Sequence, residues 1–89
     1  MYFMEALVEA GVYLGLQRAQ TTEIVTALFS GSVKMARQSG LHMSVLREMV
    51  TSPAGSTIRG TAHFDRQAVR AAIVDAVVAA CDRNRELGG

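Results

Sequence analysis

The sequence predicts an all-α protein, and three observations support this class. Apolar residues recur at i, i+4 spacing over long stretches, as in Val69, Ile73 and Val77. The 89 residues contain a single proline, Pro53, so little interrupts helix formation. No stretch of comparable length alternates apolar and polar residues in the way that a half-buried β-strand requires.

Length and composition limit the chain to one small domain over residues 1–89 that buries a modest fraction of its surface alone. Apolar residues make up 49% of it, and the net charge is +1. This balance gives no basic face for nucleic acid and disfavours a helix-turn-helix regulator. No apolar run reaches membrane-spanning length. The first residues carry no positively charged signal region, so we expect a cytoplasmic protein with no membrane partner.

The first helix is expected to span Tyr2–Leu16 and is apolar on most sides. Within its first fourteen positions only Glu5 and Glu9 carry charge. A helix that is apolar nearly all round must be buried nearly all round, which in so small a domain requires a second subunit. The chain also opens inside this helical pattern without a capping residue, so we expect it to derive from a longer protein.

A second helix is expected to follow a connection over residues 15–22, with Thr21 or Thr22 as its N-cap. It should run to about Ser39, with Gly40 as the residue that ends it. Gly31 in its middle lowers helix propensity, and the close approach of another helix would explain its presence. Ser44 is then expected to cap a short helix that runs through Val50.

The last helix is expected to begin after Asp65, with Asp65 as its N-cap and Phe64 and Val69 forming a hydrophobic staple. It should continue to Leu87. Before it, one or two helical turns are expected from Thr57, with Gly60 permitting their end. The prediction is therefore three main helices and a short fourth.

The segment Met49–Gly60 concentrates the groups that could bind a ligand. Ser52 is a suitable N-cap and Pro53 a suitable first-turn residue, and small residues follow them. Amides at the start of a helix, with the positive end of its dipole behind them, form a site for a carboxylate or phosphate. On turn chemistry alone, a tight connection between two helices explains the same residues.

This segment resembles a known family signature. Residues 39–42 read Ser-Gly-Leu-His, and residues 46–58 read Leu-Arg-Glu-Met-Val-Thr-Ser-Pro-Ala-Gly-Ser-Thr-Ile. The run is similar to the signature of Δ1-pyrroline-5-carboxylate reductases, whose usual form is Val-Thr-Ser-Pro-Gly-Gly-Thr-Thr. Ala54 stands where that family usually has Gly, Ser56 where Thr is common, and Met43 where Pro is frequent. The resemblance extends over essentially the whole chain and implies the C-terminal dimerisation domain, an interleaved helix bundle formed with a second subunit.

The resemblance also implies a site. The backbone amides around Gly55, Ser56 and Thr57 would hold the carboxylate of the cyclic imino acid, and the Thr57 hydroxyl would lie near its ring nitrogen as the catalytic group. Val50 and Ser52 would line the pocket. Such chemistry agrees with the residues, because an oriented carboxylate needs donors without bulk.

The implied activity is the NAD(P)H-dependent reduction of 1-pyrroline-5-carboxylate to L-proline, in proline biosynthesis. Neither NADP nor NAD is expected to bind this chain alone, because it contains no G-x-G-x-x-G motif or βαβ unit. We therefore expect a homodimer or higher oligomer that binds a proline-like carboxylate and is inactive by itself. The alternative is a purely structural helical dimerisation module without ligand binding.

The remaining polar residues indicate no metal site. His42 and His63 lie far apart in the sequence and lack acidic or cysteine partners at metal-ligand spacing, so both are interpreted as structural or exposed. Cys81 is the single cysteine and is interpreted as a small buried hydrophobic residue.

Overall fold

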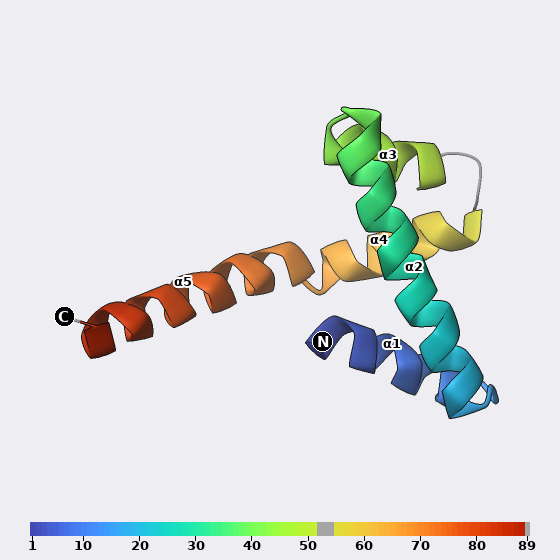
Figure 1. The fold of residues 1–89 in the computed structure, drawn as a ribbon, viewed down its shortest axis with the longest axis horizontal. Helices are drawn as coiled ribbons and strands as arrows, with labels where there is room; N and C mark the ends of the chain where they lie inside the picture. The colour runs from blue at the N-terminus through green and yellow to red at the C-terminus, as the bar shows by residue number, and fades with distance from the viewer. Residues whose placement is uncertain (52–54, 89) are drawn as a thin grey trace. The chain divides into compact units, whose positions relative to one another are not determined.

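The structure, a computed structural model, describes residues 1–51 and 55–88 (Figure 1). It contains five helices: α1 Tyr2–Tyr13, α2 Arg18–Ser39, α3 Met43–Thr51, α4 Gly55–Arg66 and α5 Val69–Gly88. These residues form no strand, which confirms the all-α class. The predicted count of three main helices and a short fourth is wrong, because the turns that follow Gly55 form a full helix of 12 residues.

The contacts within the chain divide it into two compact units, Met1–Leu46 and Arg47–Gly89. In the first unit α1 packs against α2, and α3 begins beside the C-terminal half of α2. In the second unit α4 contacts α5. The single dimerisation domain expected over residues 1–89 stays a prediction.

A glycine motif ends α1 three residues earlier than the predicted Leu16. Gly15 adopts a φ of 101°, and its amide donates to the carbonyl of Val12 at 3.0 Å. The amide of Leu16 donates to the carbonyl of Gly11, also at 3.0 Å. This pair of hydrogen bonds is the Schellman motif, which satisfies the last carbonyls of a helix and turns the chain. Gly15 therefore ends α1 rather than merely following it.

The second helix begins at Arg18, so the predicted N-cap at Thr21 or Thr22 is wrong. Gln17 occupies the N-cap position with extended backbone angles and no capping side chain. The hydroxyl of Thr21 donates instead to the carbonyl of Gln17 at 2.8 Å, and that of Thr22 to Arg18 at 2.8 Å. Threonine hydroxyls often bond back to the preceding turn in this way, which places both residues inside a helix.

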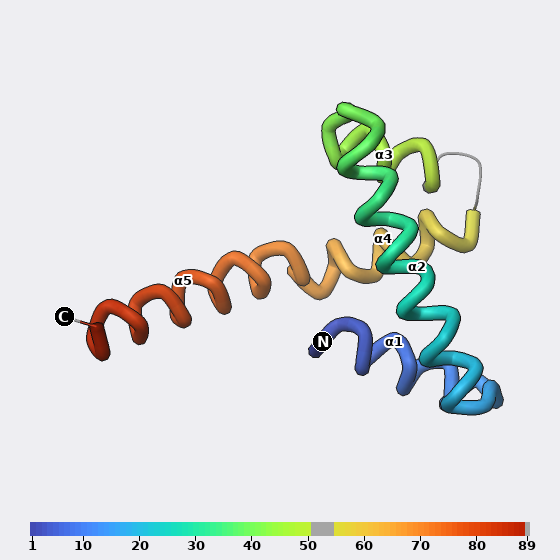
Figure 2. Tube along the Cα trace, in the orientation of Figure 1, coloured from blue at the N-terminus to red at the C-terminus, as the bar shows by residue number. Residues whose placement is uncertain are grey.

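The small core of the first unit lies where α1 contacts the N-terminal half of α2, near the connection between them (Figure 2). Val8 from α1 and Val25 from α2 are buried there, with exposed fractions of 8% and 6%. Thr21 is 4% exposed, and its side chain fills the space above Gly11. Gly11 thus allows the two backbones to approach closely, which a side chain at that position would prevent.

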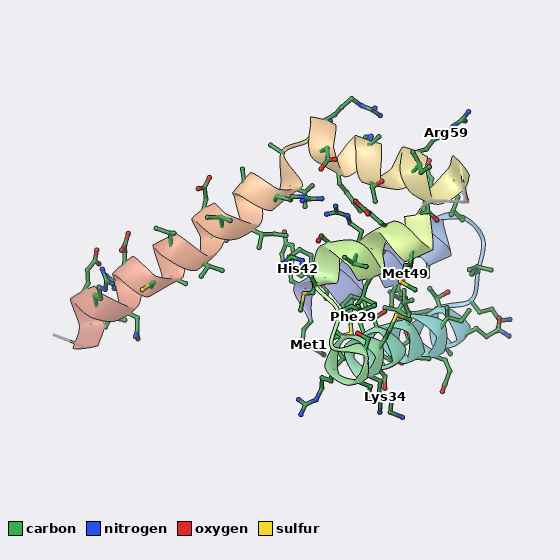
Figure 3. The ribbon with its side chains drawn as sticks, turned by 90° about the horizontal axis from the view of Figure 1, so that it is seen from above. Met1, Phe29, Lys34, His42, Met49 and Arg59 are labelled. Atoms are coloured by element: carbon green, nitrogen blue, oxygen red, sulfur yellow. The ribbon has the colours of Figure 1, made fainter. Side chains whose placement is uncertain are left out.

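The C-terminal end of α2 agrees with prediction. The helix ends at Ser39, and Gly40 adopts the left-handed conformation with a φ of 69°. The amide of Leu41 then donates to the Ser39 hydroxyl at 3.1 Å. Phe29 and Lys34 point to different sides of α2 (Figure 3), and Phe29 is half-buried whereas Lys34 is exposed.

The joint between α4 and α5 lies at Ala68, and the predicted end near Gly60 and N-cap at Asp65 are both wrong. Gly60, Phe64 and Asp65 all lie inside α4. Ala68 has a φ of 54° and is the only non-glycine residue with positive φ among the described residues. For an alanine this conformation costs roughly 1–2 kcal/mol relative to the right-handed region.

Much of the apolar surface of the chain is exposed. Besides Val8 and Val25, Leu46 is the only apolar side chain classed as buried among the described residues. The apolar side of α5 is open, with Ile73 42% and Val77 64% exposed. Cys81 is exposed as well, so its predicted burial is wrong for the single chain. An exposed apolar helix face is typical of an interaction surface.

The helices of residues 1–51 and 55–88 are too short or too polar to cross a membrane.

Replacing Gly11 by alanine is expected to destabilise the first unit. A Cβ at this position would meet the Thr21 side chain, with Thr21 Oγ1 only 3.1 Å away. Overpacking of this kind costs about 1–3 kcal/mol, which exceeds the gain of about 1 kcal/mol in helix propensity. Urea unfolding followed by circular dichroism should show a net loss on the order of 1 kcal/mol.

Gly60→Ala is the matched control for Gly11→Ala. A Cβ at position 60 meets nothing within 4 Å, so the variant should gain stability through helix propensity alone. Equal stabilisation by both alanines would contradict the close contact between α1 and α2.

Candidate functional site

The residues of the sequence-predicted site fall at the end of α3 and the start of α4. Val50 lies in the last turn of α3 and is 57% exposed. Ser52 lies outside the described residues. Gly55, Ser56 and Thr57 are the first three residues of α4. The structure therefore brings these three together in one helical turn and places Val50 on the preceding helix.

The short helix α3 is capped by His42 rather than by Ser44, which corrects the prediction for this helix. Its first residue is Met43, so Ser44 is already inside it. The amide of Ser44 donates to Nδ1 of His42 at 3.1 Å, and the Ser44 hydroxyl lies 2.7 Å from the same nitrogen. Because an amide can only donate, Nδ1 must carry a lone pair, and the Ser44 hydroxyl donates to it as well. His42 thus has a structural role, as the sequence predicted.

The first turn of α4 has the local chemistry of an anion site. The first amides of a helix have no carbonyl one turn earlier within that helix to bond, and the helix dipole adds positive charge there. The first turn of α4 contains no acidic residue that would repel an anion, and its last turn contains His63 and Arg66. A Cβ at Gly55 would meet nothing within 4 Å among the described residues, so the space beside this residue is open.

Thr57 is the half-buried member of this turn, whereas Gly55 and Ser56 are exposed. The carbonyls of Thr57 and Ile58 both accept from the hydroxyl of Thr61, at 3.2 and 3.0 Å. These bonds lie inside α4, one turn after the amides. They stabilise the helix start without using the Thr57 hydroxyl as a donor.

The part of the chain that the structure describes contains no group of three or more His, Cys, Asp or Glu side chains placed to hold a metal ion.

The chain was compared with known protein families. The family model described as pyrroline-5-carboxylate reductase dimerisation matches residues 1–87. The chain belongs to this family. Its signature segment, on which the resemblance rested, includes the start of α4.

Curated relatives named pyrroline-5-carboxylate reductase match nearly the whole chain. Pyrroline-5-carboxylate reductase from Methanosarcina acetivorans is 38% identical over 85 residues, which cover 96% of this chain and 32% of that protein. The enzyme from Corynebacterium melassecola is 42% identical, covering 94% and 31%. That from Arabidopsis thaliana is 39% identical, covering 94% and 30%. The chain thus spans about a third of the length of these relatives.

Sequence reasoning missed two details of the fold, the capping of α3 by His42 and the joint at Ala68. The prediction assigned the cap of α3 to Ser44, although a histidine directly before a helix start can accept a hydrogen bond from the amide two residues later. Ala68 gave no signal at all, because alanine is the strongest helix former and rarely takes positive φ.

Loss of the His42 cap is expected to destabilise α3. In His42→Ala the amide of Ser44 loses its side-chain acceptor, which typically costs about 0.5–2 kcal/mol. His42→Asn should recover most of this, since an asparagine oxygen can accept the same bond. Amide hydrogen exchange of residues 44–47 reports the loss, and unchanged protection in the alanine variant would mean that the cap contributes nothing.

Proposed function

We propose that this chain is the dimerisation and imino-acid-binding part of a pyrroline-5-carboxylate reductase, an oxidoreductase that makes L-proline from 1-pyrroline-5-carboxylate. The observation that carries the proposal is the start of α4. Gly55, Ser56 and Thr57 fall together in its first turn, in a chain that belongs to the family's dimerisation domain.

The proposed binding mode uses the backbone for the carboxylate and one side chain for the ring. The amides of Gly55–Thr57 hold the carboxylate, because amides in the first turn of a helix are oriented donors and Gly55 and Ser56 are small. The Thr57 hydroxyl lies beside the ring nitrogen, where charge changes when an imine is reduced. Val50 and Ser52 complete the proposed pocket wall.

The nicotinamide nucleotide, NADP or NAD, is proposed to bind outside this chain. The described residues are helical and offer no strand, Gly-rich loop and helix in sequence, which is the unit that a dinucleotide requires. The residues present therefore do not fit this cofactor. We expect the chain to be inactive alone, and the complete reductase to work in the cytoplasm.

Self-association is the second part of the proposal. Apolar side chains are exposed along α1 and α5, among them Tyr2 at 80%, Val74 at 60% and Val77 at 64%. A second copy that covers these faces would supply the apolar burial that a single chain lacks. This supports a homodimer or higher oligomer built from interleaved helices.

The competing proposal is a helical dimerisation module that binds no ligand. The exposed apolar faces support this module as much as they support an imino-acid-binding domain, because such faces require only a partner. Ligand binding at the start of α4 would distinguish the two proposals, because only the imino-acid-binding proposal predicts it.

Self-association is expected at micromolar concentration, and Val77→Glu should weaken it. Val77 is exposed in the single chain, so the change should leave its fold intact while placing a charge in the proposed interface. Sedimentation velocity should give a dimer or larger for the native chain and a dissociation constant raised about 10-fold or more for the variant.

Ala79→Glu is the matched control, because Ala79 is also exposed but lies on the side of α5 that carries Asp75 and Asp82. A native chain that remains a folded monomer would remove the interleaved dimer. Equal weakening by both glutamates would place the interface elsewhere on α5.

Weak anion binding by this chain is expected at residues 55–58. A few amide hydrogen bonds to a solvated anion provide little more free energy than its immobilisation costs. The dissociation constants of sulfate and L-proline should therefore be on the order of millimolar. A backbone NMR titration should show shifts concentrated at the start of α4. Gly55→Val should abolish them, since its branched side chain blocks the approach.

Thr57→Ala separates the two proposed contacts. It should weaken L-proline binding, which uses the hydroxyl at the ring nitrogen, and leave sulfate binding by the amides unchanged. Shifts that spread evenly over the chain, or that persist in Gly55→Val, would support the dimeriser without a ligand site.

A further inference from the structure

The joint between α4 and α5 is made by a residue whose local preferences oppose it in two ways. Ala68 has a φ of 54°, in the region where a helix end normally has glycine. The same residue stands at the N-cap position of α5, because its carbonyl accepts from the amide of Ala72 at 3.0 Å. Alanine has no side-chain oxygen to cap the amides that follow, so it is among the poorest N-cap residues.

The sequence around the joint would readily form one uninterrupted helix. Residues 61–87 contain neither glycine nor proline, and residues 66–72 consist mostly of Arg, Gln and Ala, which favour helix. The amide of Gln67 already bonds to the carbonyl of His63 at 3.1 Å, one turn earlier. The amide of Ala68 instead donates to Asp65, at 3.1 Å. A continuous helix through the joint would return it to the carbonyl of Phe64.

Little within the described chain holds the bend, which Figure 2 shows in the trace between the two helices. Arg70 and Asp65 form an ion pair across the joint at 3.7 Å, but their side chains are 68% and 62% exposed, so solvent screens it. In α5 only Val69 is half-buried, and all later described residues are exposed. A strained backbone persists only when its surroundings over-determine it.

We propose that Ala68 is a hinge with two states, a bent joint that a second copy selects and a continuous α4–α5 helix that the separate chain also populates. The inference rests on the proposed self-association. A partner that binds one state better shifts the population toward it. Covering the apolar face of α5 would therefore fix its direction relative to α4. The other end of α4 carries Gly55–Thr57. The hinge at Ala68 would therefore connect the interface on α5 to the candidate anion site.

The distance between two spin labels tests the hinge. Arg59→Cys and Asp82→Cys, in a Cys81→Ser background, place one label on each helix at exposed positions (Arg59 is labelled in Figure 3). A continuous helix puts their backbones about 35 Å apart, and the bend shortens this. Labelled chain is measured alone at low concentration and again with excess unlabelled chain, so that only distances within one chain contribute.

The native chain should show a component near 35 Å when dilute, and this component should disappear on association. Ala68→Gly removes the side chain that opposes positive φ, so it should abolish the long component and lower the dimer dissociation constant about 5-fold. Ala68→Val should enlarge the long component and weaken association. Ala79→Gly, a control in a regular part of α5, should not tighten association.

Distance distributions that are identical at both concentrations and in Ala68→Gly would overturn the hinge. Sedimentation of the same samples keeps the two proposals separate. A chain that stays monomeric would defeat the proposed self-association, while a long component that Ala68→Gly removes would still support the hinge. A single short distance in a chain that does dimerise would defeat the hinge alone.

Discussion

The constraint behind this structure is the shortage of apolar surface that one chain can bury. Apolar residues form 49% of the sequence, yet in the described residues only Val8, Val25 and Leu46 are buried apolar side chains. Burial of such surface is the dominant favourable term in folding. The local devices of the fold, which are glycine helix ends, a histidine cap and a close contact at Gly11, therefore shape the chain without completing a core. Such a sequence is typical of a dimerisation domain.

The sequence predicted helices well where local chemistry decides them. The end of α2 at Ser39 and Gly40 was correct, because a glycine at positive φ leaves few alternatives. The sequence-based prediction failed where two local signals competed. Thr21 and Thr22 have the chemistry of N-caps, but their hydroxyls bond to the preceding turn, inside a helix that begins at Arg18. Asp65 also has cap chemistry, yet it lies within α4. Cap residues mark where a helix can begin, and packing and turn geometry decide where it does.

The candidate site was predicted by order and spacing in the signature rather than by helix periodicity. Gly55, Ser56 and Thr57 are the first described residues of α4, whereas the predicted helix start at Ser52 and Pro53 lies outside the described residues. The role of the site stays a prediction, because amide geometry is shared by helix starts with and without ligands. The joint at Ala68 was beyond sequence reasoning, since a run of good helix formers gives no local reason to stop.

The Schellman motif at Gly15 has a consequence for the order of folding. It closes the connection between α1 and α2 with hydrogen bonds that span at most five residues, from Leu16 back to Gly11. Contacts between neighbouring elements form quickly, because little chain must be ordered before they are made. The α1–α2 hairpin is thus able to form on its own timescale, as a unimolecular event. Covering its exposed faces by a second copy would be a bimolecular step. The rate of assembly would therefore depend on protein concentration, whereas the rate at which the hairpin forms would not.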